Sequence, residues 1–166
     1  MKIIGFSKID GVVKMVLKGD SSLLVNRKPF FIPDWSADIR MRPCVVLRVS
    51  RLGKNIAARF ATRYYDAAAP GLNIWAADFL LKGDYARAWA FDYSMVVGNF
   101  VDLSSWQERA TIIPFDEAIS RASAVMTLRQ GDMIFVDCAT AERALVPEEV
   151  ITVNNGDEEL LFCKIK

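Results

Sequence analysis

Four residues on two predicted elements provide the most plausible chemical site in this sequence. The segment Ile39–Val49 reads IRMRPCVVLRV and has the composition of a strand. Because residues two apart in a strand share a face, Arg42 and Cys44 should point the same way. Asn73 and Asp78 follow later, around a predicted Gly-Leu-Asn turn. The pattern predicts a small polar pocket built from this strand and a distant side chain.

The chain contains no histidine, which restricts the chemistry that such a pocket can perform. A Ser-His-Asp or Cys-His nucleophile, a His-ligated metal and a His general acid or base are all excluded. Carboxylates, Lys, Cys and Tyr are the groups left for catalysis. The cysteines Cys44, Cys138 and Cys163 have no zinc-like spacing, and without a His to activate a thiolate we expect Cys44 and Cys138 to be inert.

Composition favours one folded domain spanning residues 1–166, since 52% of the residues are hydrophobic. The net charge of +1 indicates neither nucleic acid nor an anionic membrane as a partner. Lys8, Asp10 and Lys14 interrupt the early apolar run, so we expect no signal peptide, and no stretch is long enough for a membrane span. The odd number of cysteines favours a reducing, cytoplasmic setting.

Periodicity predicts the elements that would carry the pocket. Two hairpins are expected: strands 2–6 and 12–17 around an Asp10-Gly11 turn, and strands 150–153 and 160–165 around an Asn155-Gly156 turn. Two further strands are expected at 39–49, with an edge or bulge at Pro43, and at 133–136. Strand followed by loop is expected over 91–103. Helices are expected at 53–65, in a region ended by Pro70-Gly71, and at 116–128, where Ile119, Ala122, Val125 and Met126 share a face.

Several segments, in a fixed order, resemble the fumarylacetoacetate hydrolase family. The chain carries KPFFIPDWS, IRMRPCVVLRV, GKNI, ATRYYD, NIWAAD, AWAFD and SAVMTLRQGDMIFVDCA. Short bacterial members of the family carry similar segments, among them E-x-E-V-V-L-R-I, D-x-T-A-R-D, A-K-x-F-D and a final T-G-T-P turn. The resemblance extends from Lys18 to Asp137.

The resemblance implies an α+β, β-rich fold. We expect a mixed, curled β-sheet or roll like the C-terminal catalytic domain of the family, with about two main helices. Family members usually pair as dimers, so a homodimer is expected, with aromatic residues near Phe30 and Trp35 as candidate contacts.

The resemblance also implies a site that has been lost. In the family, both Glu of E-x-E and the first Asp of D-x-T-A-R-D hold Mg²⁺ or Mn²⁺, which polarises an acylpyruvate-like substrate. The matching positions here are Arg42, Cys44 and Asn73, so three carboxylates are replaced by one cation and two neutral groups. We therefore expect no metal cofactor. The family's His-Glu pair is absent as well.

Other positions of the family site differ too. The Lys of A-K-x-F-D is Trp89, Trp75 and Ala77 replace the Thr and Arg of D-x-T-A-R-D, and Asp137 lies on the altered T-G-T-P turn. Asp78 and Asp92 keep their positions, and we interpret both as structural. The vestigial pocket is predicted to comprise Arg42, Cys44, Asn73, Asp78, Trp89, Asp92 and Asp137, and none of them is assigned as catalytic.

Three functions remain open from the sequence. The first is a catalytically retired homologue that acts through binding or assembly. The second is a metal-free binder of a small 2-oxo acid, in which Arg42 takes the place of the cation. The third is an active hydrolase, isomerase or decarboxylase of the family type. Because a buried guanidinium must be paired, we expect Asp78, Asp92 or Asp137 to neutralise Arg42, with Trp75 or Trp89 packed over the former substrate space.

Overall fold

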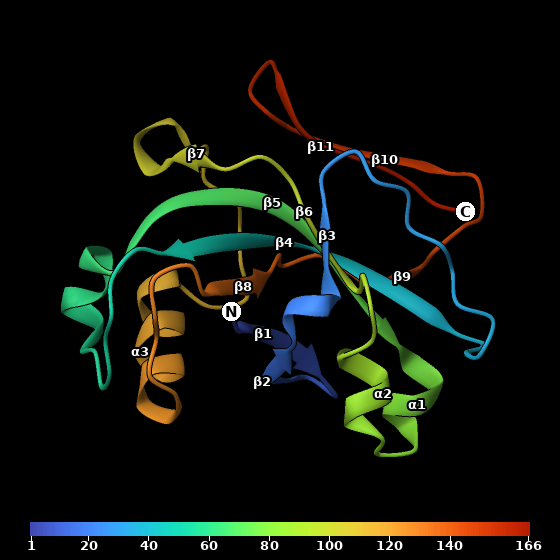
Figure 1. Ribbon diagram of the computed structural model, residues 1–166, viewed down its shortest axis with the longest axis horizontal. Coiled ribbons are helices and arrows are strands. Elements are labelled where there is room, and N and C mark those ends of the chain that lie inside the picture. The colour runs from blue at the N-terminus through green and yellow to red at the C-terminus, as the bar shows by residue number, and fades with distance from the viewer.

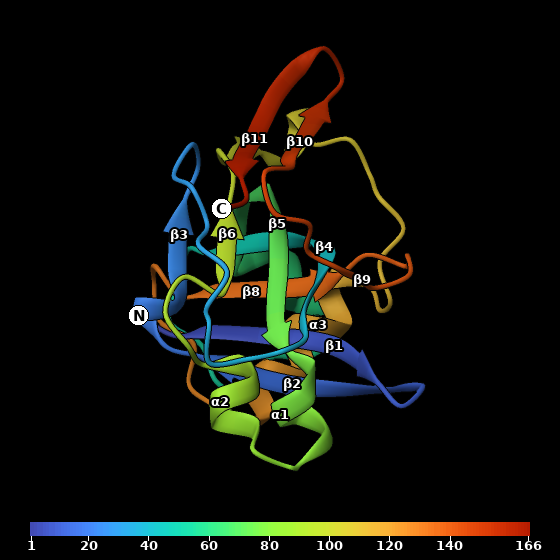
Figure 2. The ribbon, with the colours of Figure 1, turned by 90° about the vertical axis from the view of Figure 1, so that its right-hand side faces the viewer.

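A nine-stranded mixed sheet runs through the computed structural model, which describes residues 1–166 (Figure 1). The strand order is β2-β1-β8-β4-β5-β6-β3, with β7 added to β5 and β9 added to β4. A separate hairpin, β10–β11, lies at the end of the molecule opposite α1 and α2 (Figure 2). The α+β, β-rich fold predicted from the sequence is confirmed.

The bounds of the elements are as follows. The strands are β1 (Ile3–Ile9), β2 (Val12–Lys18), β3 (Leu23–Val25), β4 (Ile39–Val49), β5 (Tyr65–Ala76), β6 (Met95–Val97), β7 (Val101–Asp102), β8 (Met133–Asp137), β9 (Arg143–Ala144), β10 (Val150–Asn155) and β11 (Glu158–Lys164). The helices are α1 (Ala77–Leu81), α2 (Tyr85–Trp89) and α3 (Phe115–Val125), with 3₁₀ turns at Asp20–Ser22, Ala58–Arg63 and Leu103–Ser105. The longest helix, α3, has 11 residues, and no helix is a candidate membrane span.

The β1–β2 hairpin and β4 confirm the sequence prediction. β1 and β2 pair antiparallel from Ile3 opposite Lys18 to Ile9 opposite Val12. Asp10 and Gly11 join them with φ of 52° and 75°, as a turn with two left-handed residues requires. β4 spans the predicted residues and lies in the interior of the sheet, between β5 and β8.

The sequence does not predict strand β5, which spans Tyr65–Ala76. The predicted end at Pro70-Gly71 and the turn before Asn73 are wrong, because β5 continues through them and pairs with β4 along its length. Pro70 is tolerated because its carbonyl accepts from Gly98, in the gap between the partner strands β6 and β7. The backbone nitrogen of a strand residue faces the same side as its carbonyl, so the missing N–H costs no ladder bond.

Pro43 is tolerated in the same way, and the predicted edge or bulge at this position is wrong. Its carbonyl accepts from Cys138, so its nitrogen faces the gap between the ends of β8 and β9. The irregularity of the β4–β5 ladder lies instead between Arg48 and Val49. A proline can therefore occupy an interior strand where the neighbouring strand is interrupted.

The helix predicted over 53–65 is mostly wrong, since only the 3₁₀ turn Ala58–Arg63 forms there. Gly53 exchanges backbone hydrogen bonds with Leu128, and the Asn55 N–H donates to the Ser123 carbonyl. Asn55 also has a left-handed φ of 51°. The backbone at the start of this segment bonds to the end of α3 and to the residues that follow it, and this tertiary pairing overrides local helix propensity.

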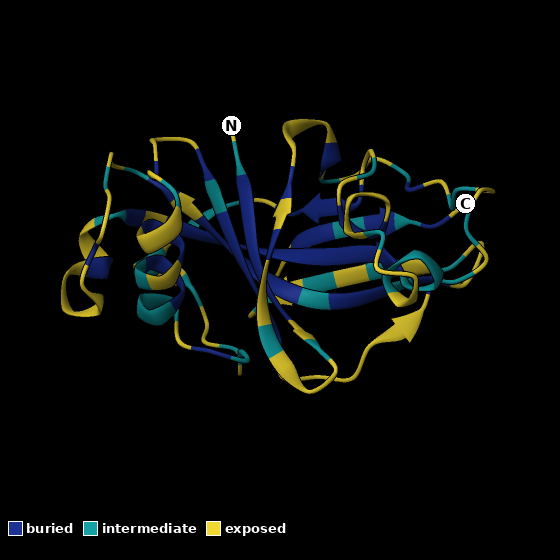
Figure 3. Ribbon diagram, turned by 90° about the horizontal axis from the view of Figure 1, so that it is seen from below, coloured by how far each residue is buried: buried dark blue, intermediate teal, exposed yellow.

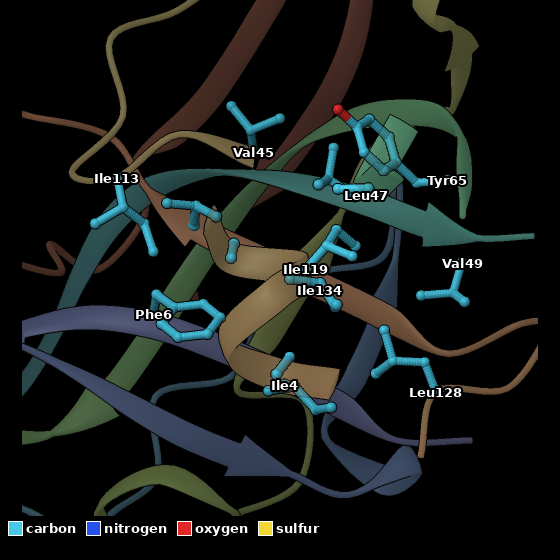
Figure 4. Packing of buried hydrophobic residues seen from close by; sticks show 14 of the residues in the cluster. Ile4, Phe6, Val45, Leu47, Val49, Tyr65, Ile113, Ile119, Leu128 and Ile134 are labelled. Atoms are coloured by element: carbon cyan, nitrogen blue, oxygen red, sulfur yellow. The ribbon is translucent and has the colours of Figure 1, made fainter. Parts of the chain in front are cut away.

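Helix α3 confirms the second predicted helix, and it covers the principal core of the sheet (Figure 4). Ile119 and Ala122 are fully buried against Ile4, Phe6 and Leu47, whereas Val125 is exposed at the helix end, contrary to its predicted place on the apolar face. The longest helix is α3, with 11 residues, and the five-residue helices α1 and α2 were not predicted.

The predicted strands β8, β10 and β11 are confirmed, but the turn between β10 and β11 lies one residue later than predicted. β8 is buried, and β10 pairs with β11, but the two residues between the paired Asn155 and Glu158 are Gly156 and Asp157. Burial is concentrated where β1, β8, β4 and β5 lie side by side (Figure 3). These four strands carry most of the candidate site residues.

Candidate functional site

Strand pairing places the predicted site residues next to one another in the interior of the sheet. Arg42 on β4 lies opposite Asn73 on β5, while Cys44 lies opposite Gly71 on one side and Asp137 on the other. Gly71 leaves room for this thiol, since an added Cβ would lie 2.9 Å from Cys44 Sγ. Arg42, Cys44, Asn73 and Asp137 are all buried.

Asp137 is the centre of a hydrogen-bonded cluster. Its Oδ2 accepts from Ser7 Oγ at 2.5 Å and from Arg42 Nη1 at 3.1 Å, and its Oδ1 accepts from Asn73 Nδ2 at 3.0 Å. Burial raises the pKa of Asp137 to about 6, even though Ser7, Asn73 and Arg42 all favour the carboxylate. Donors on β1, β4 and β5 therefore offset part, but not all, of the cost of burying the carboxylate.

Arg42 is neutralised by Asp137, as the sequence predicts. The same Nη1 lies 3.5 Å from the Lys8 carbonyl, and Nη2 lies 3.9 Å from Glu142 Oε2. The guanidinium carbon is 5.7 Å from the centre of the Trp75 ring, within the range of a cation–π contact. Arg42 is only 8% exposed, so these groups replace its hydration.

Two tryptophans pack beside this ion pair. Trp75 and Trp89 stack with their ring centroids 5.3 Å apart and an interplanar angle of 26°, and each is 3% exposed. Both belong to the buried cluster that includes Cys44, Val46 and Phe135. Trp75 therefore packs beside Arg42 and Trp89 stacks on Trp75, whereas the predicted packing over the former substrate space stays a prediction.

The comparisons with known proteins identify the fold. No family model and no curated protein matches the chain. Solved structures do match, including a candidate fumarylpyruvate hydrolase from Burkholderia cenocepacia, at 14% identity, 99% coverage of this chain, 88% coverage of that chain and a TM-score of 0.85.

Two further matches agree with the first. A candidate fumarylacetoacetate hydrolase family protein from Yersinia pestis CO92 is 17% identical, with a TM-score of 0.83. The match covers 99% of this chain and 91% of that chain. A 5-carboxymethyl-2-hydroxymuconate delta-isomerase from Mycobacterium smegmatis is 16% identical, with a TM-score of 0.84. The match covers 99% of this chain and 76% of that chain. The chain has the fumarylacetoacetate hydrolase fold.

The residues present do not fit the divalent cation that the resemblance implies for this fold. No group of three His, Cys, Asp or Glu side chains is placed to hold a metal ion. The three positions that resemble the metal ligands carry a guanidinium, a thiol and an amide, so only the Asn73 carbonyl oxygen is a ligand of the kind that Mg²⁺ prefers, and none of the three is anionic. The nearby carboxylate, Asp137, already binds Arg42, Asn73 and Ser7.

The cysteines are not activated as nucleophiles in this structure. Burial and the negative charge of Asp137 raise the pKa of Cys44 well above its usual value. Burial likewise raises the pKa of Cys138. Both thiols are therefore protonated near neutral pH, which agrees with the expectation that they are inert.

Asp78 and Asp92 lie outside the cluster around Asp137. Asp78 accepts from Ser36 Oγ at 2.6 Å and from the Ala37 N–H at 3.1 Å, and these bonds hold its pKa below the usual value against desolvation. Asp92 is exposed. The structural interpretation of Asp78 is consistent with these bonds, and neither residue pairs with Arg42.

Lys18 and Ser7 were missed by sequence reasoning. Lys18 Nζ donates to the carbonyls of Ile74, Trp89 and Ser94 at 2.8–3.1 Å and contacts Ser94 Oγ at 3.0 Å. Burial lowers the pKa of Lys18 to about 7, while Cys44 and Asp137 favour its charged form. A lysine at the end of an exposed edge strand gives no signal of this position in the sequence.

Proposed function

We propose that this protein is a non-catalytic relative of the hydrolases and isomerases that share its fold, and that it acts through binding or assembly. The observation that supports the proposal is the contact of Arg42 Nη1 with Asp137 Oδ2 at 3.1 Å, inside the sheet. A positive charge occupies the position where the resemblance implies a metal ligand. Asp137, the carboxylate that remains, accepts hydrogen bonds from Arg42, Ser7 and Asn73.

Electrostatics supports the loss of metal-dependent chemistry. At an effective dielectric constant of about 20, a single positive charge about 4 Å from a divalent cation is repelled by about 8 kcal/mol. Neutral Cys44 and Asn73 contribute no compensating charge. Asp137 would have to leave Arg42 unpaired in order to bind a metal, and an unpaired buried charge costs several kcal/mol.

The test is an activity assay on the purified protein. Acylpyruvates and oxaloacetate are incubated with the wild-type protein and Mg²⁺ or Mn²⁺, with an active enzyme of the same fold as the positive control. We expect no metal-stimulated C–C cleavage, isomerisation or decarboxylation above background. Turnover that depends on metal and on protein concentration would overturn the proposal and establish the hydrolase or isomerase alternative.

Assembly of two copies is part of the proposal, with a revised contact surface. Phe30 is buried beside β11 and is therefore unavailable, whereas Trp35 is 43% exposed. Trp35 packs edge-on against Phe79 and Phe91, beside an apolar hollow of about 580 Å³. A Trp35→Ser variant should be monomeric in light scattering if this surface holds a dimer. A wild-type protein that is itself monomeric at micromolar concentration would contradict the dimer.

The compartment belongs to the proposal as well. Cys44, Cys138 and Cys163 are all buried and unpaired. We infer a reducing, cytoplasmic setting, because free thiols persist where thiol reductants are abundant. A thiol count on protein isolated from its native cell under denaturing, alkylating conditions should give three free thiols, and an intermolecular disulfide would contradict the inference.

A further inference from the structure

The segment between β4 and β5 carries an unbalanced positive charge at one end of the molecule, beside α3 (Figure 1). From Ile39 to Tyr65 the sequence contains no Asp or Glu. Five exposed cations lie in this segment or next to it, and none of them takes part in an ion pair: Arg51, Lys54, Arg59, Arg63 and Arg129. Because the whole chain has a net charge of only +1, the rest of the molecule is acidic on balance.

Backbone hydrogen bonds hold these cations close together. Gly53 exchanges two backbone hydrogen bonds with Leu128, and the Ser50 N–H donates to the Tyr64 carbonyl. Each of these four residues is the sequence neighbour of one of the five cations. The backbone beneath the positive charge is therefore fixed before any partner binds, so binding does not have to order it.

Large apolar side chains are exposed among these cations. Three of them, which are 67%, 38% and 62% exposed, are Leu52, Phe60 and Val125. The guanidinium carbons of Arg59 and Arg63 each lie 4.8 Å from the centre of the Phe60 ring. Lys54 Nζ donates to the Ala124 carbonyl at 3.0 Å, next to the last of the three. We refer to the five cations and these three apolar residues as the basic–apolar surface.

We propose that the basic–apolar surface docks on a lipid bilayer that carries anionic headgroups. Anionic headgroups attract clustered Lys and Arg, while exposed apolar side chains enter the boundary between the headgroups and the acyl chains. Exposed Leu52 and Val125 favour a bilayer over nucleic acid, whose bases are bound by stacking on rings and by hydrogen bonds. Repulsion between like charges disfavours a second copy of the chain at this surface.

The basic–apolar surface is separate from the cluster around Asp137. It begins where β4 ends, after Val49, whereas Arg42 lies near the start of that strand. The proposal therefore goes beyond the proposed function and does not depend on whether the cluster is catalytic. The net charge of the whole chain gives no sign of this surface, because it averages the basic end with the acidic remainder.

The experiment is co-sedimentation of the full chain with vesicles of phosphatidylcholine, alone or with about one-third phosphatidylserine. We expect binding to the phosphatidylserine vesicles only, and weaker binding as salt is raised. The double variant Arg51→Ala/Arg129→Ala should bind about 25-fold more weakly, since each cation near such a surface contributes about fivefold. Leu52→Ser should weaken binding about tenfold, because its apolar contribution is lost. All three positions are exposed, so the variants should unfold at the wild-type temperature.

The double variant Lys14→Ala/Lys28→Ala is the matched control. It removes the same charge from two exposed lysines outside the surface, so it should bind close to the wild-type level. The proposal is wrong if phosphatidylserine vesicles do not bind, if neutral vesicles bind equally well, or if both double variants lose the same affinity. Binding of duplex RNA or polyglutamate without binding of phosphatidylserine vesicles would also overturn it. These failures would leave the proposed function intact, which metal-dependent turnover alone would overturn.

Discussion

Arg42 and Lys18 are both cations inside the sheet, but the protein accommodates them in different ways. Arg42 is paired with a carboxylate, Asp137 at 3.1 Å, and is further enclosed by Ser7 and Asn73 around that carboxylate. Lys18 has no carboxylate within ion-pair distance, and its ammonium is held by three backbone carbonyls and Ser94 Oγ. One site relies on opposite charge and the other on dipoles.

The difference follows from what each group can do on burial. A guanidinium stays protonated in any protein environment, so Arg42 requires a permanent counter-charge. An ammonium can lose its proton, and burial lowers the pKa of Lys18 to about 7. Arg42 therefore requires a specific acidic partner, and the predictions below test that requirement.

The largest effect is expected for Asp137→Ala. The change leaves Arg42 buried and unpaired, because Arg42 cannot discharge itself, and removes the acceptor of Ser7 and Asn73. We expect a loss of about 3–5 kcal/mol in the free energy of unfolding, measured by urea denaturation. Asp66→Ala is the control: Asp66 also pairs with an arginine, Arg48 at 2.9 Å, but both are exposed, so about 0–1 kcal/mol is expected.

Arg42→Met should be less damaging, and its cost should depend on pH. The change leaves Asp137 without its cation, so the pKa of Asp137 should rise above its present value of about 6. We expect a loss of about 3 kcal/mol at pH 8 and clearly less at pH 5, where Asp137 is protonated and neutral. An equal loss at both pH values in urea denaturation would mean that Asp137 does not carry the buried charge.

Lys18→Met tests the second cation through the pH dependence of stability. The pKa of Lys18 is lowered from 10.5 to about 7 in the folded protein, so between these values the unfolded chain binds more protons. Wild-type stability should therefore rise, by about 2–4 kcal/mol, as pH increases from 7 to 10. The Lys18→Met variant should lack this rise, whereas a Lys14→Met variant should keep it. Identical slopes for the wild type and Lys18→Met would refute the assignment.

Ser7→Ala should have the smallest effect of the series. It removes one of the three donors to Asp137 and leaves the ion pair with Arg42 in place. We expect a loss of about 1–2 kcal/mol in thermal or urea unfolding. A loss as large as that of Asp137→Ala would show that the serine, rather than the arginine, determines the stability of the cluster.

Local patterns predicted much of the sheet. Alternation and turn chemistry located the β1–β2 hairpin, β4, β8 and the β10–β11 hairpin, and apolar spacing located α3. The failures have a common cause. Pro70 and Gly71 predicted the end of an element, yet both lie within β5. The gap between β6 and β7 lies opposite the Pro70 nitrogen, so the proline loses no backbone hydrogen bond of the sheet. That gap is a tertiary feature.

The site was predictable where strand alternation defined it and not elsewhere. The alternation of a strand predicted that Arg42 and Cys44 lie on one face. The need of a buried guanidinium for a counter-charge predicted Asp137 among the candidate partners of Arg42. Ser7 reaches the Asp137 cluster from β1, which pairs in parallel with β8, and Lys18 reaches its own buried site from β2, which pairs with β1. No local pattern encodes that pairing, so these two residues were visible only in the structure.

The most direct test of the proposal that this protein binds no metal is a Mn²⁺ titration followed by electron paramagnetic resonance. We predict that the wild type leaves the spectrum of free aqueous Mn²⁺ unchanged. Arg42→Glu should behave the same way, because Cys44 and Asn73 still supply no negative charge. Stoichiometric, Mg²⁺-displaceable binding of Mn²⁺ by the wild type, abolished by Asp137→Asn, would contradict the proposal that the Arg42–Asp137 pair stands where the resemblance implies a metal.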